Sequence, residues 1–122
     1  MKSSEKHDDL VEEAKYLLEI VLSGANIDKA HGLEHANKVL VNTDLALNHI
    51  VLSERQVLAV RLASLLHDAD DRKFFPSDTD NAEGILRLIL PYDPETRKLV
   101  LQMIDLFFCS KNVIDKKGIK QE

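Results

Sequence analysis

Apolar positions recur along most of this chain at the three- and four-residue spacing of amphipathic helices. Five helical segments are predicted: about Ser4 to Ser23, Leu33 to Asn48 or His49, Ser53 to about His67, Asn81 to Leu90, and Pro94 to about Asn112. The third segment is apolar almost all round, so we expect it to be the central, buried helix. The predicted fold class is all-α, a bundle of about five helices.

Polar residues mark where these helices begin. Ser53 with Gln56, and Asp80 with Glu83, have the spacing of capping boxes. In such a box the first side chain accepts a hydrogen bond from a backbone N–H that the helix leaves unpaired. These pairs therefore predict the first turns of the third and fourth helices.

The last predicted helix begins at Asp93, an N-cap residue placed before a proline that suits the first helical turn. After Asn112 the chain becomes polar and rich in lysine, and we expect residues 113–122 to form a flexible tail. Residues 1–122 are expected to form a single domain. Because the chain stops so soon after its last core helix, C-terminal helices are expected to be lacking.

The amino-acid composition and net charge argue against some classes of protein, such as nucleic-acid binders and membrane-spanning proteins. Of the 122 residues, 44% are hydrophobic and 30% are charged, which is typical of a soluble globular domain. The net charge of −5 argues against a nucleic-acid binder, which would carry a basic stripe. A polar N-terminus and the lack of long apolar runs predict a cytoplasmic protein without a membrane span. The single Cys109 permits no internal disulfide.

The candidate chemistry lies at His67-Asp68, which ends the apolar run of the third helix. An imidazole and a neighbouring carboxylate at a helix end, joined by an imidazole from another helix, form a plausible donor set for a divalent metal. Structural roles explain the same pair, with His67 at the helix C-terminal dipole and Asp68 capping the next turn. Both interpretations stay open.

His31 and His35 are four residues apart, so on a helix both face the same way. The two imidazoles can bind one metal together. Alternatively, His35 is the third donor beside His67 and Asp68, while His31 lies in the helix entry and supports a ligand or contacts phosphate. Three protein ligands leave positions open for water and substrate, which is the catalytic pattern.

Further polar residues surround this candidate site. Asp71 follows Asp68 by one turn and suits a general acid or base, although a solvated acidic loop is the simpler interpretation. Lys38, Arg72 and Lys73 suit phosphate oxygens. Exposed basic residues are common, so none of these three alone identifies a phosphate-bearing ligand.

The chain reads AHGLEHANKV at 30–39 and ASLLHDADDRKF at 63–74. Together and in this order, the two motifs resemble the HD-domain superfamily of metal-dependent phosphohydrolases. The resemblance covers roughly Leu10 to Asn112. It implies an all-helical bundle that hydrolyses phosphomonoesters or phosphodiesters of nucleotides, and therefore a phosphorylated small-molecule substrate. His35, His67 and Asp68 would be metal ligands.

The resemblance also implies a proton-transfer role for Asp71. His31 matches a histidine often found before the first ligand, and Lys38 stands where the family commonly has arginine. The family's fourth ligand, an Asp on a later helix, has no counterpart here. Asp105 comes too early, and Asp115 fits no family motif.

The expected activity is therefore metal-dependent phosphohydrolysis. The alternatives are a catalytically degenerate HD-fold binding or regulatory module, and a structural domain that associates with a partner or a second copy. The metal is Mn, Fe, Ni, Co, Zn or Mg, since mixed imidazole and carboxylate ligation suits each to some degree.

Overall fold

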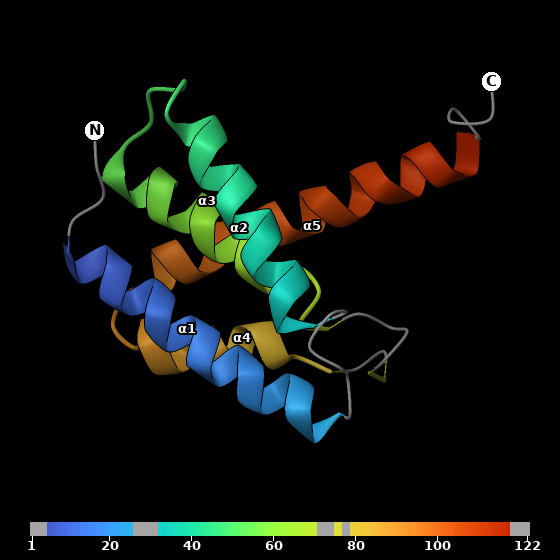
Figure 1. The fold of residues 1–122 in the computed structure, drawn as a ribbon, viewed down its shortest axis with the longest axis horizontal. Helices are drawn as coiled ribbons and strands as arrows, with labels where there is room; N and C mark the ends of the chain where they lie inside the picture. The colour runs from blue at the N-terminus through green and yellow to red at the C-terminus, as the bar shows by residue number, and fades with distance from the viewer. Residues whose placement is uncertain (1–4, 26–31, 71–74, 77–78, 118–122) are drawn as a thin grey trace.

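Five α-helices make up the computed structural model, which describes residues 5–25, 32–70, 75–76 and 79–117 (Figure 1). The helices are α1 (Glu5–Gly24), α2 (Leu33–Leu47), α3 (Glu54–Leu66), α4 (Asn81–Ile89) and α5 (Pro94–Lys117). No strand occurs in the described ranges. The predicted all-α class is confirmed. None of the described helices has the length and apolar character needed to cross a membrane.

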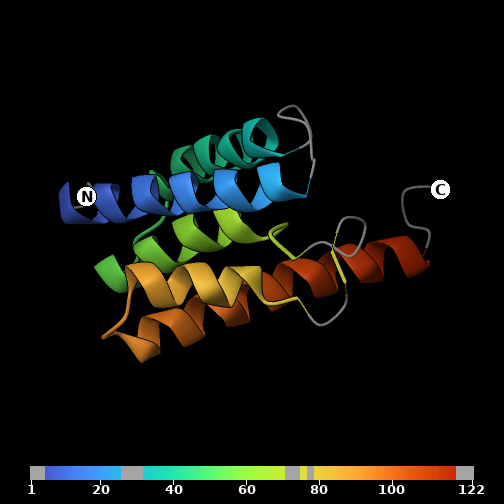
Figure 2. The same ribbon diagram turned by 90° about the horizontal axis from the view of Figure 1, so that it is seen from below.

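Helix α3 lies at the centre of the bundle. Figure 2 shows it between α2 and α5, and it contacts both of these helices as well as α1. Its buried residues are Leu58, Ala59, Leu62, Ala63, Ser64, Leu65 and Leu66. The prediction of a central, buried third helix is therefore confirmed, and its C-terminal end reaches the surface at His67.

Two predicted helix starts form as expected. The Ser53 hydroxyl accepts a hydrogen bond from the Gln56 backbone N–H at 3.1 Å, and the Gln56 side chain accepts one from the Ser53 N–H at 3.0 Å. At the start of α5, Asp93 accepts hydrogen bonds from the Thr96 backbone N–H at 3.1 Å and the Thr96 hydroxyl at 2.6 Å. Both caps satisfy donors that the first helical turn leaves unpaired.

The predicted capping box at the start of α4 is wrong. Asp80 occupies the N-cap position but its side chain makes no capping hydrogen bond, and Glu83 does not close the box. The Asp70 carboxylate instead accepts from the backbone N–H groups of Asn81 and Ala82. A residue from a preceding segment has therefore replaced the local cap, which a sequence window around the helix cannot predict.

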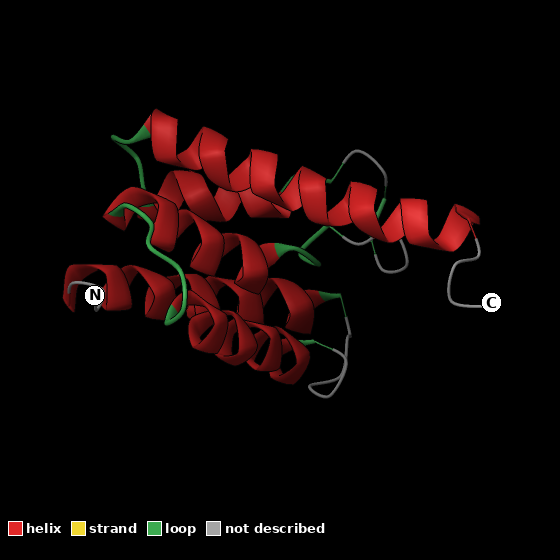
Figure 3. Ribbon diagram, turned by 90° about the horizontal axis from the view of Figure 1, so that it is seen from above, coloured by secondary structure: helices red, strands yellow, loops and turns green. Residues whose placement is uncertain are grey.

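Helix α5 continues to Lys117, past Asn112, where the polar tail was predicted to begin. Figure 3 shows its last turns extending beyond the ends of the other helices. The inward face includes fully buried Val100 and the partly buried Leu99, Met103 and Ile104. The remainder of the predicted tail, residues 118–122, lies outside the described residues.

Arg61 of α3 links three helices. Its guanidinium donates from Nε to Asp44 Oδ1 at 2.9 Å and from Nη2 to Asp44 Oδ2 at 3.5 Å. A third bond runs from Nη1 to Asp8 Oδ1 of α1 at 3.0 Å. Only 12% of the Arg61 side chain is exposed, so these bonds form in a partly desolvated setting where they are stronger than in water. The network fixes α1 and α2 against α3.

Candidate metal centre

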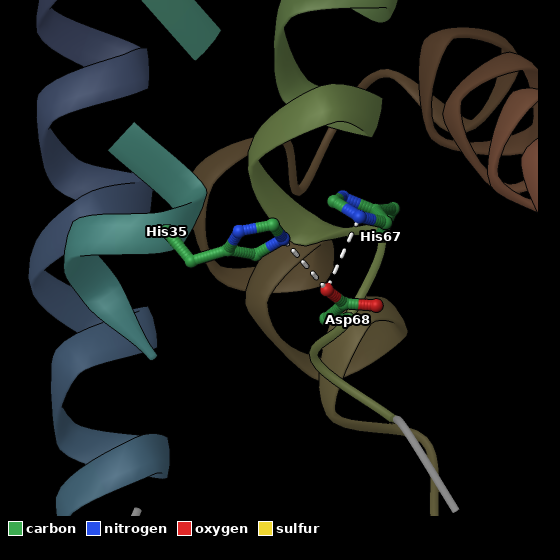
Figure 4. A group of neighbouring side chains, drawn as sticks. All are labelled: His35, His67 and Asp68. Atoms are coloured by element: carbon green, nitrogen blue, oxygen red, sulfur yellow. Dashed lines mark ion pairs between the residues drawn. The ribbon is translucent and has the colours of Figure 1, made fainter. Parts of the chain in front are cut away.

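The packing of α2 against α3 brings two predicted ligand segments together. His35 lies in the first turn of α2, His67 is the C-cap of α3, and Asp68 follows it. Figure 4 shows both imidazoles directed at the Asp68 carboxylate. Asp68 Oδ2 lies 3.4 Å from His35 Nε2 and 3.1 Å from His67 Nε2. The structure therefore places together the three residues predicted as ligands.

This group lies at the surface above the apolar core. The exposed side-chain fractions are 47% for His35, 38% for Asp68 and 21% for His67. Leu66 and Ala69, which flank the His67-Asp68 pair in sequence, are fully buried. A small solute can therefore approach the donor atoms from solvent, while the buried neighbours hold the backbone of the pair in place.

A hydrogen bond fixes the tautomer of His67. Its Nδ1 lies 2.8 Å from the backbone carbonyl oxygen of Ser64, and a carbonyl oxygen only accepts. Nδ1 therefore carries the proton, and in the neutral ring the Nε2 lone pair faces Asp68 Oδ2. Two facing lone pairs repel each other, so the arrangement favours a proton or a cation between them. Metal-bound histidines commonly donate their second ring N–H to a carbonyl in this way.

The donor separations fit a shared divalent ion. Metal–ligand bonds of about 2.1 Å place two ligand atoms about 3.0 Å apart at a right angle and about 3.4 Å apart at the tetrahedral angle. The separations of 3.1 and 3.4 Å around Asp68 Oδ2 match this interval. One ligand atom from each residue lies within 4.8 Å of the other two. Two imidazoles and one carboxylate therefore fit a metal in donor chemistry, and both separations from the Asp68 oxygen suit a shared ion.

Of the other predicted substrate-binding and catalytic residues, Lys38 lies in the described part of the chain. Lys38 is exposed on α2, three residues after His35 and therefore on a neighbouring part of the same helix face. His31, Asp71, Arg72 and Lys73 lie outside the described residues. Asp105 is exposed on α5 and does not join the group. Among the described residues the group contains three donors, one of them a carboxylate, and no fourth donor.

Asp70 and Asn81 form a contact that the sequence interpretation missed. Besides the two backbone bonds to Asp70, the Asn81 side-chain amide donates to the Ala69 carbonyl oxygen at 2.9 Å. Burial raises the pKa of Asp70, and the nearby Asp80 charge acts in the same direction, whereas the backbone bonds from Ala82 and Asn81 oppose the rise. The sequence offered no signal for this pairing, because the partners are separated by a whole connecting segment.

No family model, curated protein or solved structure matches this chain. The resemblance of its two histidine motifs to HD domains therefore stays a prediction. The fold itself supplies a solvent-facing group of two imidazoles and one carboxylate, contributed by α2 and by the end of α3.

Proposed function

We propose that this chain is an HD-type metal-dependent phosphohydrolase acting on a phosphomonoester or phosphodiester of a nucleotide-like small molecule. The observation that supports the proposal is the convergence of His35, His67 and Asp68, which come from separate segments, around a common point. The family resemblance of the motifs that carry these residues points in the same direction.

Each ligand has a defined task in this proposal. His67 presents Nε2 because its Nδ1 is bonded to the Ser64 carbonyl oxygen. Asp68 supplies the negative charge that offsets part of a divalent charge, and His35 couples α2 to the site. A divalent ion held there would polarise a phosphoryl oxygen and lower the pKa of an attacking water. Three protein ligands leave room for both water and substrate.

The remaining predicted residues would serve the substrate. Lys38 is exposed one turn along α2 from His35, where an ammonium group can neutralise a phosphate oxygen. We propose the same role for His31, Arg72 and Lys73. We propose Asp71 as the group that moves a proton to the leaving oxygen or from the attacking water.

A second candidate function has its own support. The described residues bring together three donors, only one of which is a carboxylate, and each donor is partly exposed. Fewer carboxylates mean weaker attraction for a divalent ion. A binding or regulatory module of the same fold, with little or no turnover, is therefore the alternative.

A phosphatase screen with matched histidine variants tests the proposal. The protein is purified without chelator and assayed on nucleotide mono- and diesters with Mn, Fe, Ni, Co, Zn or Mg. We expect hydrolysis with at least one metal, and a loss of at least about 100-fold in His35→Ala and His67→Ala. The control is His49→Ala, which removes an exposed histidine beyond the opposite end of α2.

The outcomes separate the two functions. Hydrolysis that survives in both ligand variants would show that the reaction does not use this group. Tight metal binding without hydrolysis of any ester would favour the binding module. Loss of activity in His49→Ala as well would mean that histidine substitution acts through stability, and the ligand assignment would then lose its support.

A further inference from the structure

Three hydrogen bonds join the residues that follow Asp68 to the first turn of α4. Asp70 Oδ1 accepts from the Asn81 backbone N–H at 2.6 Å, and Asp70 Oδ2 accepts from the Ala82 N–H at 3.2 Å. In return, the Asn81 side chain donates to the Ala69 carbonyl oxygen at 2.9 Å. The contact is reciprocal, because each segment uses one side chain to hold the backbone of the other.

This reciprocal contact lies immediately beside the candidate metal ligand. Asp68 stands beyond the last residue of α3, in a turn whose backbone no longer has the full helical hydrogen-bond pattern. On its α3 side, the Ala69 N–H of the turn donates to the Leu66 carbonyl oxygen at 2.9 Å. On its far side, Ala69 and Asp70 hold the turn against α4 through their hydrogen bonds with Asn81 and Ala82. The backbone of Asp68 is therefore fixed from both directions.

The first turn of α4 is capped by the distant Asp70, which indicates that Asp70 has a role beyond helix capping. Asp80 already occupies the N-cap position of α4, and aspartate is among the strongest N-cap residues, yet its side chain makes no capping bond. The backbone N–H groups of the first turn donate to Asp70 instead. Local capping would stabilise α4 equally well. Only the distant cap also ties the segment after Asp68 to the bundle.

We propose that Asp70 and Asn81 are positioning residues that hold Asp68 in register with His35 and His67, so that removing either one weakens metal binding. This inference rests on the proposed metal site. Neither residue belongs to the group of candidate donors. They act by keeping the Asp68 carboxylate within 3.1 to 3.4 Å of both imidazoles. Partners that orient metal ligands typically contribute about 10- to 100-fold to metal affinity.

A cobalt titration of the metal-free full-length chain tests the inference. Co²⁺ binding is followed by its visible absorption band in the wild type and in Asp70→Ala, Asp70→Asn, Asn81→Ala and Asp80→Ala. We expect Asp70→Ala and Asn81→Ala to raise the dissociation constant by about tenfold or more. Asp70→Asn keeps one acceptor oxygen for the Asn81 N–H and should fall between Asp70→Ala and the wild type.

Asp80→Ala is the matched control, because it removes an aspartate at the start of the same helix that makes no side-chain cap. It should leave cobalt affinity unchanged. The unfolding transition of each metal-free variant is recorded in parallel. A purely structural cap would lower the unfolding midpoint and leave the affinity and absorption band of the folded protein as in the wild type.

The results distinguish this inference from the proposed function. Wild-type affinity in both Asp70→Ala and Asn81→Ala would overturn the positioning role while leaving the metal site intact. Failure of the wild type itself to bind cobalt or another divalent ion would overturn the metal site, and the positioning role with it. Should Asp70→Ala fail to fold, Asn81→Ala and Asp70→Asn carry the same comparison.

Discussion

His35 Nε2 of α2 lies 3.4 Å from Asp68 Oδ2, which stands in the turn after α3. This separation depends on how the two helices pack, since no local spacing relates the two residues. Arg61 bonds α3 to Asp44 of α2 and so controls the same packing. The candidate site is therefore sensitive to substitutions well away from its donor atoms.

Loss of Arg61 should destabilise the bundle. Arg61→Ala removes charge-assisted bonds to Asp44 and Asp8 in a setting where the arginine is mostly buried. We expect the free energy of unfolding to fall by about 2 kcal/mol, the usual size for a hydrogen bond to a charged group. Urea denaturation measures the change, and a double-mutant cycle with Asp44→Ala isolates the pair.

Arg87→Ala is the matched control for Arg61→Ala. Arg87 pairs with Glu83 one turn away on the exposed side of α4, and 67% of its side chain is exposed. Its loss should cost only about 0.3–0.5 kcal/mol. Equal effects of the two arginine variants would contradict the linking role of Arg61.

Truncation in the centre of α3 should be far more costly than truncation at the surface. Leu62 is fully buried, so Leu62→Ala leaves a cavity and should lower the free energy of unfolding by about 2–5 kcal/mol. Leu88→Ala removes the same atoms from a residue that is 65% exposed and should change it by less than about 0.5 kcal/mol. Similar losses in the two variants would argue against α3 as the core helix.

Asp93 should make the stability of the fold depend on pH. The Thr96 hydroxyl bond is the main cause that lowers the pKa of Asp93 below its ordinary value of 3.8. The Thr96 N–H and the charges of Arg55 and Arg97 add to it, and partial burial opposes it. The folded state thus favours the charged carboxylate. This stabilisation is complete above the unfolded value and is lost as pH falls through the folded value.

Asp93→Ala should therefore cost about 1 kcal/mol near pH 7, the usual value of an N-cap, and less near pH 2. Ser53→Ala is the control, because it removes a cap whose hydroxyl does not titrate, and its cost should be similar at both pH values. Chemical denaturation of the three proteins at each pH provides the measurement. A cost for Asp93→Ala that does not change with pH would contradict this role of its carboxylate.

The helices were predictable because their signals are local. The nearly all-round apolar character of the third segment and the Ser53–Gln56 cap depend on residues within a few positions of each other, and both formed as predicted. Asp80 shows the limit of this reasoning. Its position and residue type satisfy the local rule, yet Asp70 takes its place through a tertiary contact that no local pattern contains.

The candidate site was predictable only in part, for the same reason. Residue types and helix-end placement singled out His67 and Asp68, with His35 as a possible third donor, and the family resemblance then gave all three as metal ligands. Their separations depend on the packing of α2 on α3, which spacing along the chain does not encode. The carbonyl partner of His67 and the Asp70–Asn81 contact are also properties of the folded chain.

The most direct test of the account is a Mn²⁺ titration of the metal-free protein, with free Mn²⁺ measured by electron paramagnetic resonance. The account predicts one bound ion per chain in the wild type and in Asp9→Ala, which alters an exposed aspartate of α1. It predicts affinity at least about tenfold weaker in Asp68→Ala. Equal binding by Asp68→Ala and the wild type would contradict a metal site built from His35, His67 and Asp68.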